Sequence, residues 1–235
     1  MKIITQEIFD PSFNEKKIKV FMRRLDLISH PVSGNKYFKL KYNIDYAIKS
    51  KLNTIITFGG AYSNHILATS IISRENNLKS IGLIRGEKTL PLNSTLTDAV
   101  KNGMEIIYLS RKNYRKINDE EYLNQLRIKY KKSYIIPEGG TNSLAIRGTE
   151  SIIKSDEKFE YICCPIGTGG TISGIINSSN HNQKIIGFSA IKGVKNIIDN
   201  ISNNVNKDNW YINDDYCQNG YAKISKDLID FIYNF

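Results

Sequence analysis

Apolar runs of strand length alternate with helical patterns along most of the 235-residue chain. Residues 54–58 form a short run rich in β-branched residues, which is typical of a buried strand, and a helical pattern follows at about 63–75. The same spacing predicts strands at 18–22, 80–84, 105–109, 134–136, 161–164, 184–188 and 210–212, and helices at about 36–48, 92–101, 120–131, 142–153, 170–177, 194–201 and 226–233. Strand followed by helix, repeatedly, predicts an α/β fold whose parallel sheets have helices on both faces.

Glycine-rich turns occupy four of the positions at which a helical pattern begins. They are SGNK at 33–36, GGAYSNH at 59–65, GGTN at 139–142 and GTGGT at 167–171. In open α/β sheets, ligands bind outside the carboxyl ends of the strands, where such turns lie. The sequence therefore predicts a ligand crevice that these turns line.

Lys36 is the most informative residue of the first turn. It lies at a predicted helix N-terminus with Asn35 as the predicted N-cap, and a cation there opposes the helix dipole. Such a position suits a lysine whose amine is partly neutral, as a lysine that forms an imine with an aldehyde cofactor must be. Lys39 lies one turn further on the same face, where its charge suits an anionic group. Taken alone, a lysine-rich helix start is more often a solvated surface.

The GTGGT turn offers unhindered backbone N–H groups at a helix start, and a phosphate dianion is the natural occupant of such a nest. A dinucleotide fingerprint would require glycine at position 172, where the chain has Ile172, and that motif belongs to the first strand-to-helix turn. A purely structural glycine loop remains the alternative.

The GGAYSNH turn presents the N–H groups and side chains of Ser63, Asn64 and His65 at the start of a helix. A serine and a histidine two residues apart invite a nucleophile and base interpretation. Neighbours on one helical turn do not face each other, and the chain has no G-x-S-x-G elbow, so this interpretation is rejected. A helix N-cap followed by a histidine with satisfied hydrogen bonds fits the local sequence equally well.

Taken in order, the motifs RLDL, SGNKYFKLKY, FGGAYSNH, LIRGE, IPEGGTN, CCPIGTGGT and GYA resemble those of pyridoxal-phosphate enzymes of the tryptophan-synthase-β fold type. Within that fold type, the chain resembles the D-cysteine desulfhydrase and 1-aminocyclopropane-1-carboxylate deaminase family over nearly its whole length. The resemblance implies two open parallel-sheet α/β domains with the cofactor, pyridoxal 5'-phosphate, in the cleft between them (fold type II). It places a small domain at 49–144 and a large domain at 1–48 and 145–235.

The resemblance also implies roles for residues in these turns. Lys36 would bind the cofactor aldehyde covalently with Asn35 beside it, and Asn64 would bind the ring oxygen. Ser63 would be a proton donor or nucleophile, and Tyr221 would line the active site. The GGAYSNH turn would bind the substrate carboxylate through Ser63, Asn64 and His65. The phosphate would lie in a cup whose residues are Gly167, Thr168, Gly169, Gly170 and Thr171, with the charge of Lys39 added.

Two hypotheses of different class follow. The first is a lyase or deaminase that converts D-cysteine to pyruvate, sulfide and ammonia, or 1-aminocyclopropane-1-carboxylate to 2-oxobutanoate and ammonia. The second is a C-terminally truncated relative without turnover that binds the cofactor weakly or not at all. Family members continue beyond Phe235 with an active-site tyrosine and the group that faces the pyridine nitrogen. The residues that separate desulfhydrase from deaminase lie in that segment, so the sequence leaves the substrate open.

Composition bears on the partners and the location expected for the protein. The formal net charge is +10, but the basic residues are spread along the chain, and acidic residues interrupt the densest group at 111–132. That group is interpreted as a solvated helix face, so no nucleic-acid partner is expected. The three cysteines form no disulfide framework, the three histidines have no metal-like spacing with them, and no stretch approaches the ~20 apolar residues of a membrane span. We expect a cytoplasmic homodimer with no metal and no membrane contact, acting on a small amino acid.

Overall fold

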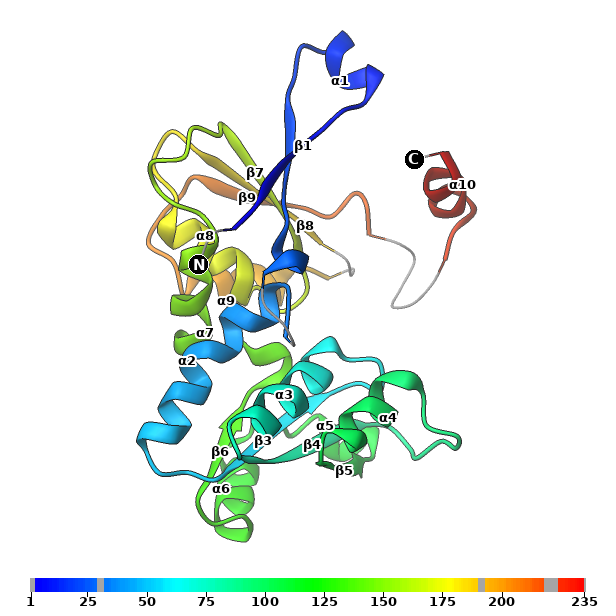
Figure 1. Ribbon diagram of the computed structural model, residues 1–235, viewed down its shortest axis with the longest axis vertical. Coiled ribbons are helices and arrows are strands. Elements are labelled where there is room, and N and C mark those ends of the chain that lie inside the picture. The colour runs from blue at the N-terminus through cyan, green and yellow to red at the C-terminus, as the bar shows by residue number, and fades with distance from the viewer. Residues whose placement is uncertain (1–2, 29–31, 190–192, 218–223, 235) are drawn as a thin grey trace. The chain divides into compact units, whose positions relative to one another are not determined.

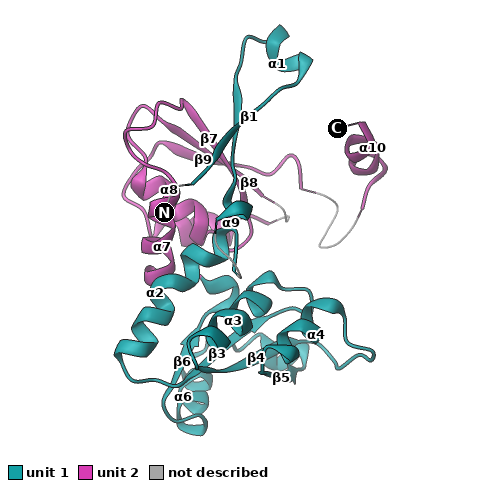
Figure 2. Cartoon of the chain, viewed as in Figure 1, with its two compact units in different colours: residues 1–140 teal, residues 141–235 magenta. Residues whose placement is uncertain are grey.

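The computed structural model describes residues 3–28, 32–189, 193–217 and 224–234 (Figure 1). The chain forms two compact units, residues 1–140 and 141–235 (Figure 2). The domains predicted above divide the chain differently, because they assign residues 1–48 to the domain that also holds the C-terminal part. That assignment stays a prediction.

A four-stranded parallel sheet forms the centre of unit 1, in the order β5-β4-β3-β6. Every residue of β3 is buried, as its β-branched run predicts. Thr57 in β3 pairs with Gly82 on one side and with Ile136 on the other. The predicted strands of this unit are thereby confirmed, as β3 (Thr54–Gly59), β4 (Lys79–Arg85), β5 (Met104–Leu109) and β6 (Ser133–Ile136).

Helices cover both faces of this sheet. Ile55 packs with Leu40, Ile44 and Ala68 of α2 and α3, while the next residue, Ile56, packs on the opposite face with Tyr114 and Leu126 of α5 and α6. Consecutive residues of a strand point to opposite faces, so both faces of β3 require apolar residues. The helices of the unit are α2 (Asn35–Lys49), α3 (Asn64–Glu75), α4 (Ser94–Lys101), α5 (Arg111–Tyr114) and α6 (Glu120–Lys129).

Unit 1 begins with a small antiparallel hairpin of β1 (Thr5–Ile8) and β2 (Val20–Arg23), joined through α1 (Pro11–Glu15) and followed by the 3-10 turn η1 (Leu25–Leu27). The strand predicted at 18–22 corresponds to β2. Neither β1 nor α1 was predicted, because both are short and have no buried residue that would produce a periodic apolar pattern.

Unit 2 contains a three-stranded parallel sheet in the order β7-β8-β9. Its helix α8 is apolar on most sides and buries Ile172, Ile175 and Ile176. The elements are α7 (Ser143–Thr149), the 3-10 turn η3 (Glu150–Ile152), β7 (Tyr161–Ile166), α8 (Gly170–Ser178), β8 (Lys184–Ser189), α9 (Lys195–Ser202), β9 (Trp210–Asn213) and α10 (Lys226–Asn234).

Two predictions for unit 2 need correction. The helix predicted at 142–153 ends at Thr149 and continues as the 3-10 turn η3. The strand that looked buried, at 161–164, is half-buried instead: Tyr161 and Cys163 are exposed, whereas Cys164 and Ile166 are buried. Buried and exposed positions alternate in the second half of β7. The residues at both kinds of position are apolar, so the sequence shows no alternation of apolar and polar residues.

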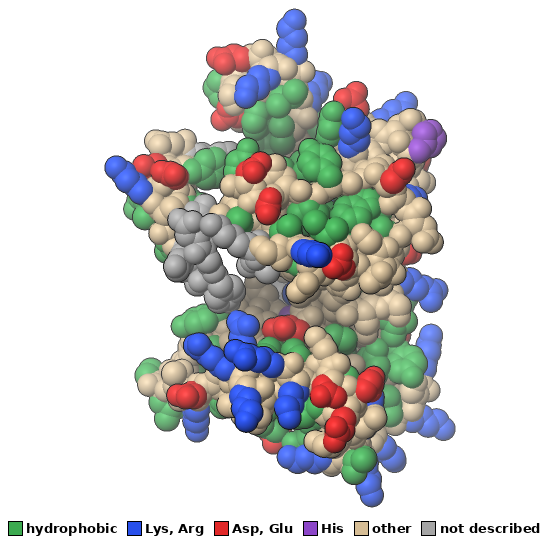
Figure 3. Space-filling model, turned by 180° about the vertical axis from the view of Figure 1, so that it is seen from behind, with side chains coloured by type: hydrophobic (Ala, Val, Ile, Leu, Met, Phe, Trp, Pro, Cys, Tyr) green, Lys and Arg blue, Asp and Glu red, His purple; other side chains and the backbone are tan. Residues whose placement is uncertain are grey.

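Lys and Arg side chains are spread over the face seen in Figure 3, with Asp and Glu side chains among them. Most of α6, in the densest basic stretch, is exposed, and Leu126 is its buried residue, so the prediction of a solvated helix face is confirmed. Among the described residues, no helix has both the length and the apolar character that a membrane span requires.

Candidate active site

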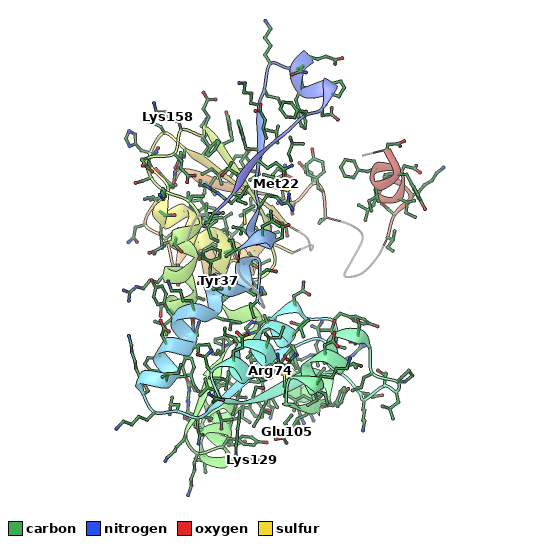
Figure 4. The ribbon with its side chains drawn as sticks, viewed as in Figure 1. Met22, Tyr37, Arg74, Glu105, Lys129 and Lys158 are labelled. Atoms are coloured by element: carbon green, nitrogen blue, oxygen red, sulfur yellow. The ribbon has the colours of Figure 1, made fainter. Side chains whose placement is uncertain are left out.

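The lysine turn opens α2 in unit 1. Gly34, with φ of 69°, is the N-cap of α2, and Asn35 is the first helical residue. The prediction of Asn35 as the N-cap is therefore wrong by one position. A left-handed φ is strained for residues with a side chain, so glycine suits the cap. Tyr37, labelled in Figure 4 at the start of α2, packs edge to face on Phe38, with ring centroids 5.4 Å apart.

Lys36 is partly buried in the first turn of α2. Burial lowers the pKa of its amine below the ordinary value of a lysine, because an ammonium loses hydration when it is buried. Within the described chain, no carboxylate forms an ion pair with Lys36 that would oppose this effect. Burial thus shifts the amine towards its neutral form, which is the form that attacks an aldehyde, and the role of Lys36 stays a prediction.

Lys39 is fully buried one turn further along α2. Its Nζ donates a hydrogen bond of 2.6 Å to the backbone oxygen of Gly139, in the turn that follows β6. Gly139 itself has φ of 64°. The charge of Lys39 therefore holds the GGTN turn to the start of α2. Its predicted contact with a phosphate stays a prediction.

The GGAYSNH turn connects β3 to α3. Ser63 is the N-cap of α3, and its hydroxyl accepts a hydrogen bond of 3.4 Å from the Ile66 N–H. Asn64 is exposed at the first position of the helix. A Cβ on Gly59 would lie 2.7 Å from Ile66 Cγ1, so the strand can end this close to α3 because residue 59 is glycine.

His65 is buried, and its ring is fixed by a hydrogen-bond chain. Thr57 Oγ1 donates to the Ile136 oxygen at 2.9 Å and lies 2.8 Å from His65 Nε2. A hydroxyl has one hydrogen, so the Nε2 of His65 must be the donor to Thr57. Nδ1 then carries a lone pair, and it is buried with no hydrogen-bond partner in the part of the chain that the structure describes.

The charge of the His65 ring follows from its surroundings. Burial, together with the positive charges of Lys36 and Lys39, lowers the pKa of His65 well below its usual range. The imidazole is therefore neutral at physiological pH. Its Cε1 and Nδ1 edge faces Gly140, where a Cβ would lie 2.9 Å from Cε1.

The sheet brings these turns of unit 1 together. Because β3 and β6 are parallel neighbours, the GGAYSNH and GGTN turns leave the sheet at the same edge. This pair of turns lies as a shared crevice would require, and the crevice itself stays a prediction. Lys39 bonds to the Gly139 oxygen at this edge, and the charges of Lys36 and Lys39 act on the buried His65 ring.

The GTGGT turn forms the corresponding feature of unit 2. It leads from β7 into α8, and Gly169, with φ of 86°, is the N-cap. Gly169 and Gly170 are buried, while Thr168 is partly exposed. The glycine N-cap brings no side chain to the start of α8, and the positive end of a helix dipole favours an anion.

One predicted site residue is not described, and two residues near the site were not predicted. Tyr221 lies outside the described residues. Sequence reasoning missed Thr57, whose contact with His65 depends on strand pairing. It also missed Tyr114, whose hydroxyl donates to Glu138 Oε1 at 2.7 Å and anchors the turn that contains Gly139. Neither residue belongs to a motif. In the described ranges, no three His, Cys, Asp or Glu side chains gather as a metal site would require.

Solved structures share the architecture. The crystal structure of a 1-aminocyclopropane-1-carboxylate deaminase homologue matches with a TM-score of 0.82 and 23% identity, over 100% of this chain and 77% of that one. A serine racemase from Dictyostelium discoideum matches with a TM-score of 0.63 and 17% identity, over 86% of this chain and 65% of that one. The parallel α/β architecture is that of fold type II, so the predicted fold class is confirmed.

Curated relatives identify the family, although no family model matches. A Thermotoga maritima protein, provisionally named 1-aminocyclopropane-1-carboxylate deaminase, is 32% identical over 236 residues, covering 91% of this chain and 75% of that protein. The Arabidopsis thaliana bifunctional D-cysteine desulfhydrase/1-aminocyclopropane-1-carboxylate deaminase is 33% identical over 177 residues, covering 67% of this chain and 44% of that protein. This chain belongs to the D-cysteine desulfhydrase and 1-aminocyclopropane-1-carboxylate deaminase family.

Proposed function

We propose that this protein is a pyridoxal-phosphate-dependent lyase or deaminase whose substrate is D-cysteine or 1-aminocyclopropane-1-carboxylate. The names of the two curated relatives support this substrate class. The observation that carries the proposal is Lys36, a partly buried lysine of lowered pKa beside a neutral histidine. A lysine that reacts with an aldehyde at neutral pH needs such an environment.

The proposal assigns residues to both ends of the cofactor. Lys36 would bind the aldehyde, with Asn35 next to it, and Asn64 would donate to the ring oxygen. The turn of residues 167–171, with the glycine-capped start of α8, would hold the phosphate dianion. Lys39 would add its charge. When bound, the cofactor supplies an electron sink for negative charge that develops on the substrate.

The start of α3 would bind the substrate carboxylate. Ser63, Asn64 and His65 begin this helix, and N–H groups in a first helical turn suit an anion. His65 would contribute its backbone N–H, because its Nε2 already donates to Thr57. Ser63 would act on the substrate as a proton donor or nucleophile, since this cap residue is partly exposed. Tyr221 would line the same site.

The test of the cofactor assignment is covalent trapping. The protein is incubated with pyridoxal 5'-phosphate, reduced with borohydride and digested, and the modified lysine is identified by mass spectrometry. We expect modification of Lys36 and its loss in Lys36→Ala. Lys41→Ala is the matched control, because Lys41 is an exposed lysine of the same helix. Modification at Lys39 or Lys41 in place of Lys36 contradicts the assignment.

The test of the reaction is product release. D-cysteine, L-cysteine and 1-aminocyclopropane-1-carboxylate are each supplied, and sulfide, pyruvate, 2-oxobutanoate and ammonia are measured. Sulfide with pyruvate from D-cysteine identifies the desulfhydrase, whereas 2-oxobutanoate identifies the deaminase. Trapping at Lys36 without any product supports the alternative of a relative without turnover. A homodimer and a cytoplasmic location stay predictions, which light scattering and cell fractionation test.

A further inference from the structure

A pair of hydroxyls in unit 2 joins Thr141, in the second half of the GGTN turn, to Thr168 of the GTGGT turn. Thr141 Oγ1 and Thr168 Oγ1 are 2.6 Å apart, which is a short hydrogen bond. Thr141 precedes Asn142, the N-cap of α7, and Thr168 precedes Gly169, the N-cap of α8. The approaches to the two helices are therefore tied to each other.

The C-terminal end of α7 also contacts the GTGGT turn. Thr149, the last residue of α7, is fully buried, and its Oγ1 lies 3.1 Å from the Gly170 oxygen and 2.9 Å from the Ile146 oxygen. A Cβ on Gly174 would overlap Thr149 Oγ1, so glycine at 174 permits this close crossing of α7 and α8. Through its two ends, α7 fixes both sides of the bend into α8.

Helix α9 provides a third contact. Asn200 Nδ2 donates to the Thr168 oxygen at 3.1 Å. A Cβ on Gly169 would lie 3.0 Å from Ile201 Cγ1, so the Ile201 side chain packs against the left-handed glycine. Three side chains thus restrain this bend. Thr141 bonds to the Thr168 hydroxyl, Asn200 bonds to the Thr168 carbonyl oxygen, and Ile201 packs against the Cα of Gly169.

Such restraint matters for a turn made of glycines. A glycine-rich segment loses more conformational entropy than other sequences when it is fixed in one conformation. A nest of N–H groups binds an anion tightly only if the groups already point at it, because ordering them upon binding reduces affinity. The contacts from α7 and α9 supply that order in advance.

We infer that Thr141 is a positioning residue for the phosphate of the cofactor, acting through its hydroxyl bond to Thr168. This rests on the proposed function. Thr141 holds the turn, so its hydroxyl matters for ligands that carry a phosphate and not for the aldehyde chemistry at Lys36. The consequence is selectivity between pyridoxal 5'-phosphate and pyridoxal, which has the same aldehyde and ring without the phosphate.

The experiment measures dissociation constants of both aldehydes by absorbance titration of the full chain. Thr141→Val keeps the branched shape and removes the hydroxyl, while Thr141→Ser keeps the hydroxyl. Ser143→Ala, an exposed neighbour at the start of α7, is the control for general effects. We expect Thr141→Val to raise the dissociation constant of pyridoxal 5'-phosphate about tenfold, which corresponds to the loss of one hydrogen bond. The dissociation constant of pyridoxal should rise less than about twofold. Thr141→Ser and Ser143→Ala should match the original chain.

Asn200→Ala provides a second variant at an exposed position and should shift the selectivity in the same direction. Equal weakening of both aldehydes, or no weakening in Thr141→Val, overturns the inference while the proposed function stands. An original chain that binds neither aldehyde refutes the proposed function, and the inference with it. A backbone amide spectrum of Thr141→Val adds a readout independent of the cofactor, since the Gly169 and Gly170 signals should move and those of unit 1 should not.

Discussion

Thr57 accepts a hydrogen bond from His65, and this 2.8 Å contact fixes which nitrogen of a buried imidazole carries the proton. Thr57 can only accept, because its own hydrogen goes to the Ile136 oxygen across the β3–β6 pair. The sheet thus determines the tautomer of a side chain in the next helix. The neutral ring also fills the space beneath Gly140 without adding charge to an edge that already holds Lys36 and Lys39.

The charge state of His65 predicts how stability depends on pH. In the unfolded chain His65 takes up a proton near pH 6.5, whereas the folded ring stays neutral well below that value. The neutral ring therefore contributes fully to the free energy of unfolding above pH 6.5. This contribution is lost as the pH falls towards the lower pKa of the folded state, at roughly 1.4 kcal/mol per pH unit. Urea unfolding at pH 7.5 and 5.5 measures this loss.

His65→Gln is the matched control for that measurement. Glutamine places a neutral N–H donor where Nε2 of histidine lies, so the contact with Thr57 is kept while the titration is removed. We expect the original chain to lose more stability than His65→Gln between the two pH values, by roughly 1 kcal/mol. An equal loss in both proteins would show that His65 takes up its proton in the folded state as readily as in the unfolded one.

Removing the Thr57 hydroxyl should destabilise unit 1 more than removing its methyl. Thr57→Val leaves the Ile136 oxygen and the His65 N–H without partners, at roughly 1 to 3 kcal/mol for each buried group. Thr57→Ser keeps both hydrogen bonds and loses a buried methyl, which costs about 1 kcal/mol. The free energies of unfolding at pH 7.5 test the order, and the idea of a hydroxyl-fixed tautomer fails if the serine variant is the less stable.

Lys36 should be more reactive than an ordinary lysine at moderately alkaline pH. Burial lowers its pKa, so a larger fraction of its amine is neutral below pH 10.5. Competitive acetylation of the cofactor-free protein over pH 7 to 11, read by peptide mass spectrometry with exposed Lys41 as the internal reference, measures the titration of Lys36. We expect its midpoint below 10.5. A midpoint at or above 10.5 contradicts the neutral-amine environment.

Local patterns in the sequence predicted most helices and strands. The site contacts that were missed join segments that lie apart in the sequence. The β-branched run of β3 and the Ser63 cap of α3 are local features, so both could be predicted. The Lys39 ammonium, by contrast, meets a backbone oxygen 100 positions away. Thr57 and His65 meet because a strand and the following helix pack together, and no residue pattern encodes the direction of the hydrogen bond between them. The cap at Gly34 was displaced by one residue because helix boundaries are the least certain part of such predictions.

Gly140 offers the sharpest test of the arrangement around His65. Its φ of 72° strains any residue with a side chain, and a Cβ there would lie 2.9 Å from His65 Cε1. Gly140→Ala must therefore displace a ring that is tied to Thr57, and we expect a loss of about 2 to 4 kcal/mol in the free energy of unfolding. Gly60→Ala is the matched control, since a Cβ on Gly60 meets nothing within 4 Å and its φ is not left-handed. It should change stability by less than about 1 kcal/mol. If Gly140→Ala is as stable as Gly60→Ala, the His65 ring does not pack against the turn at Gly140.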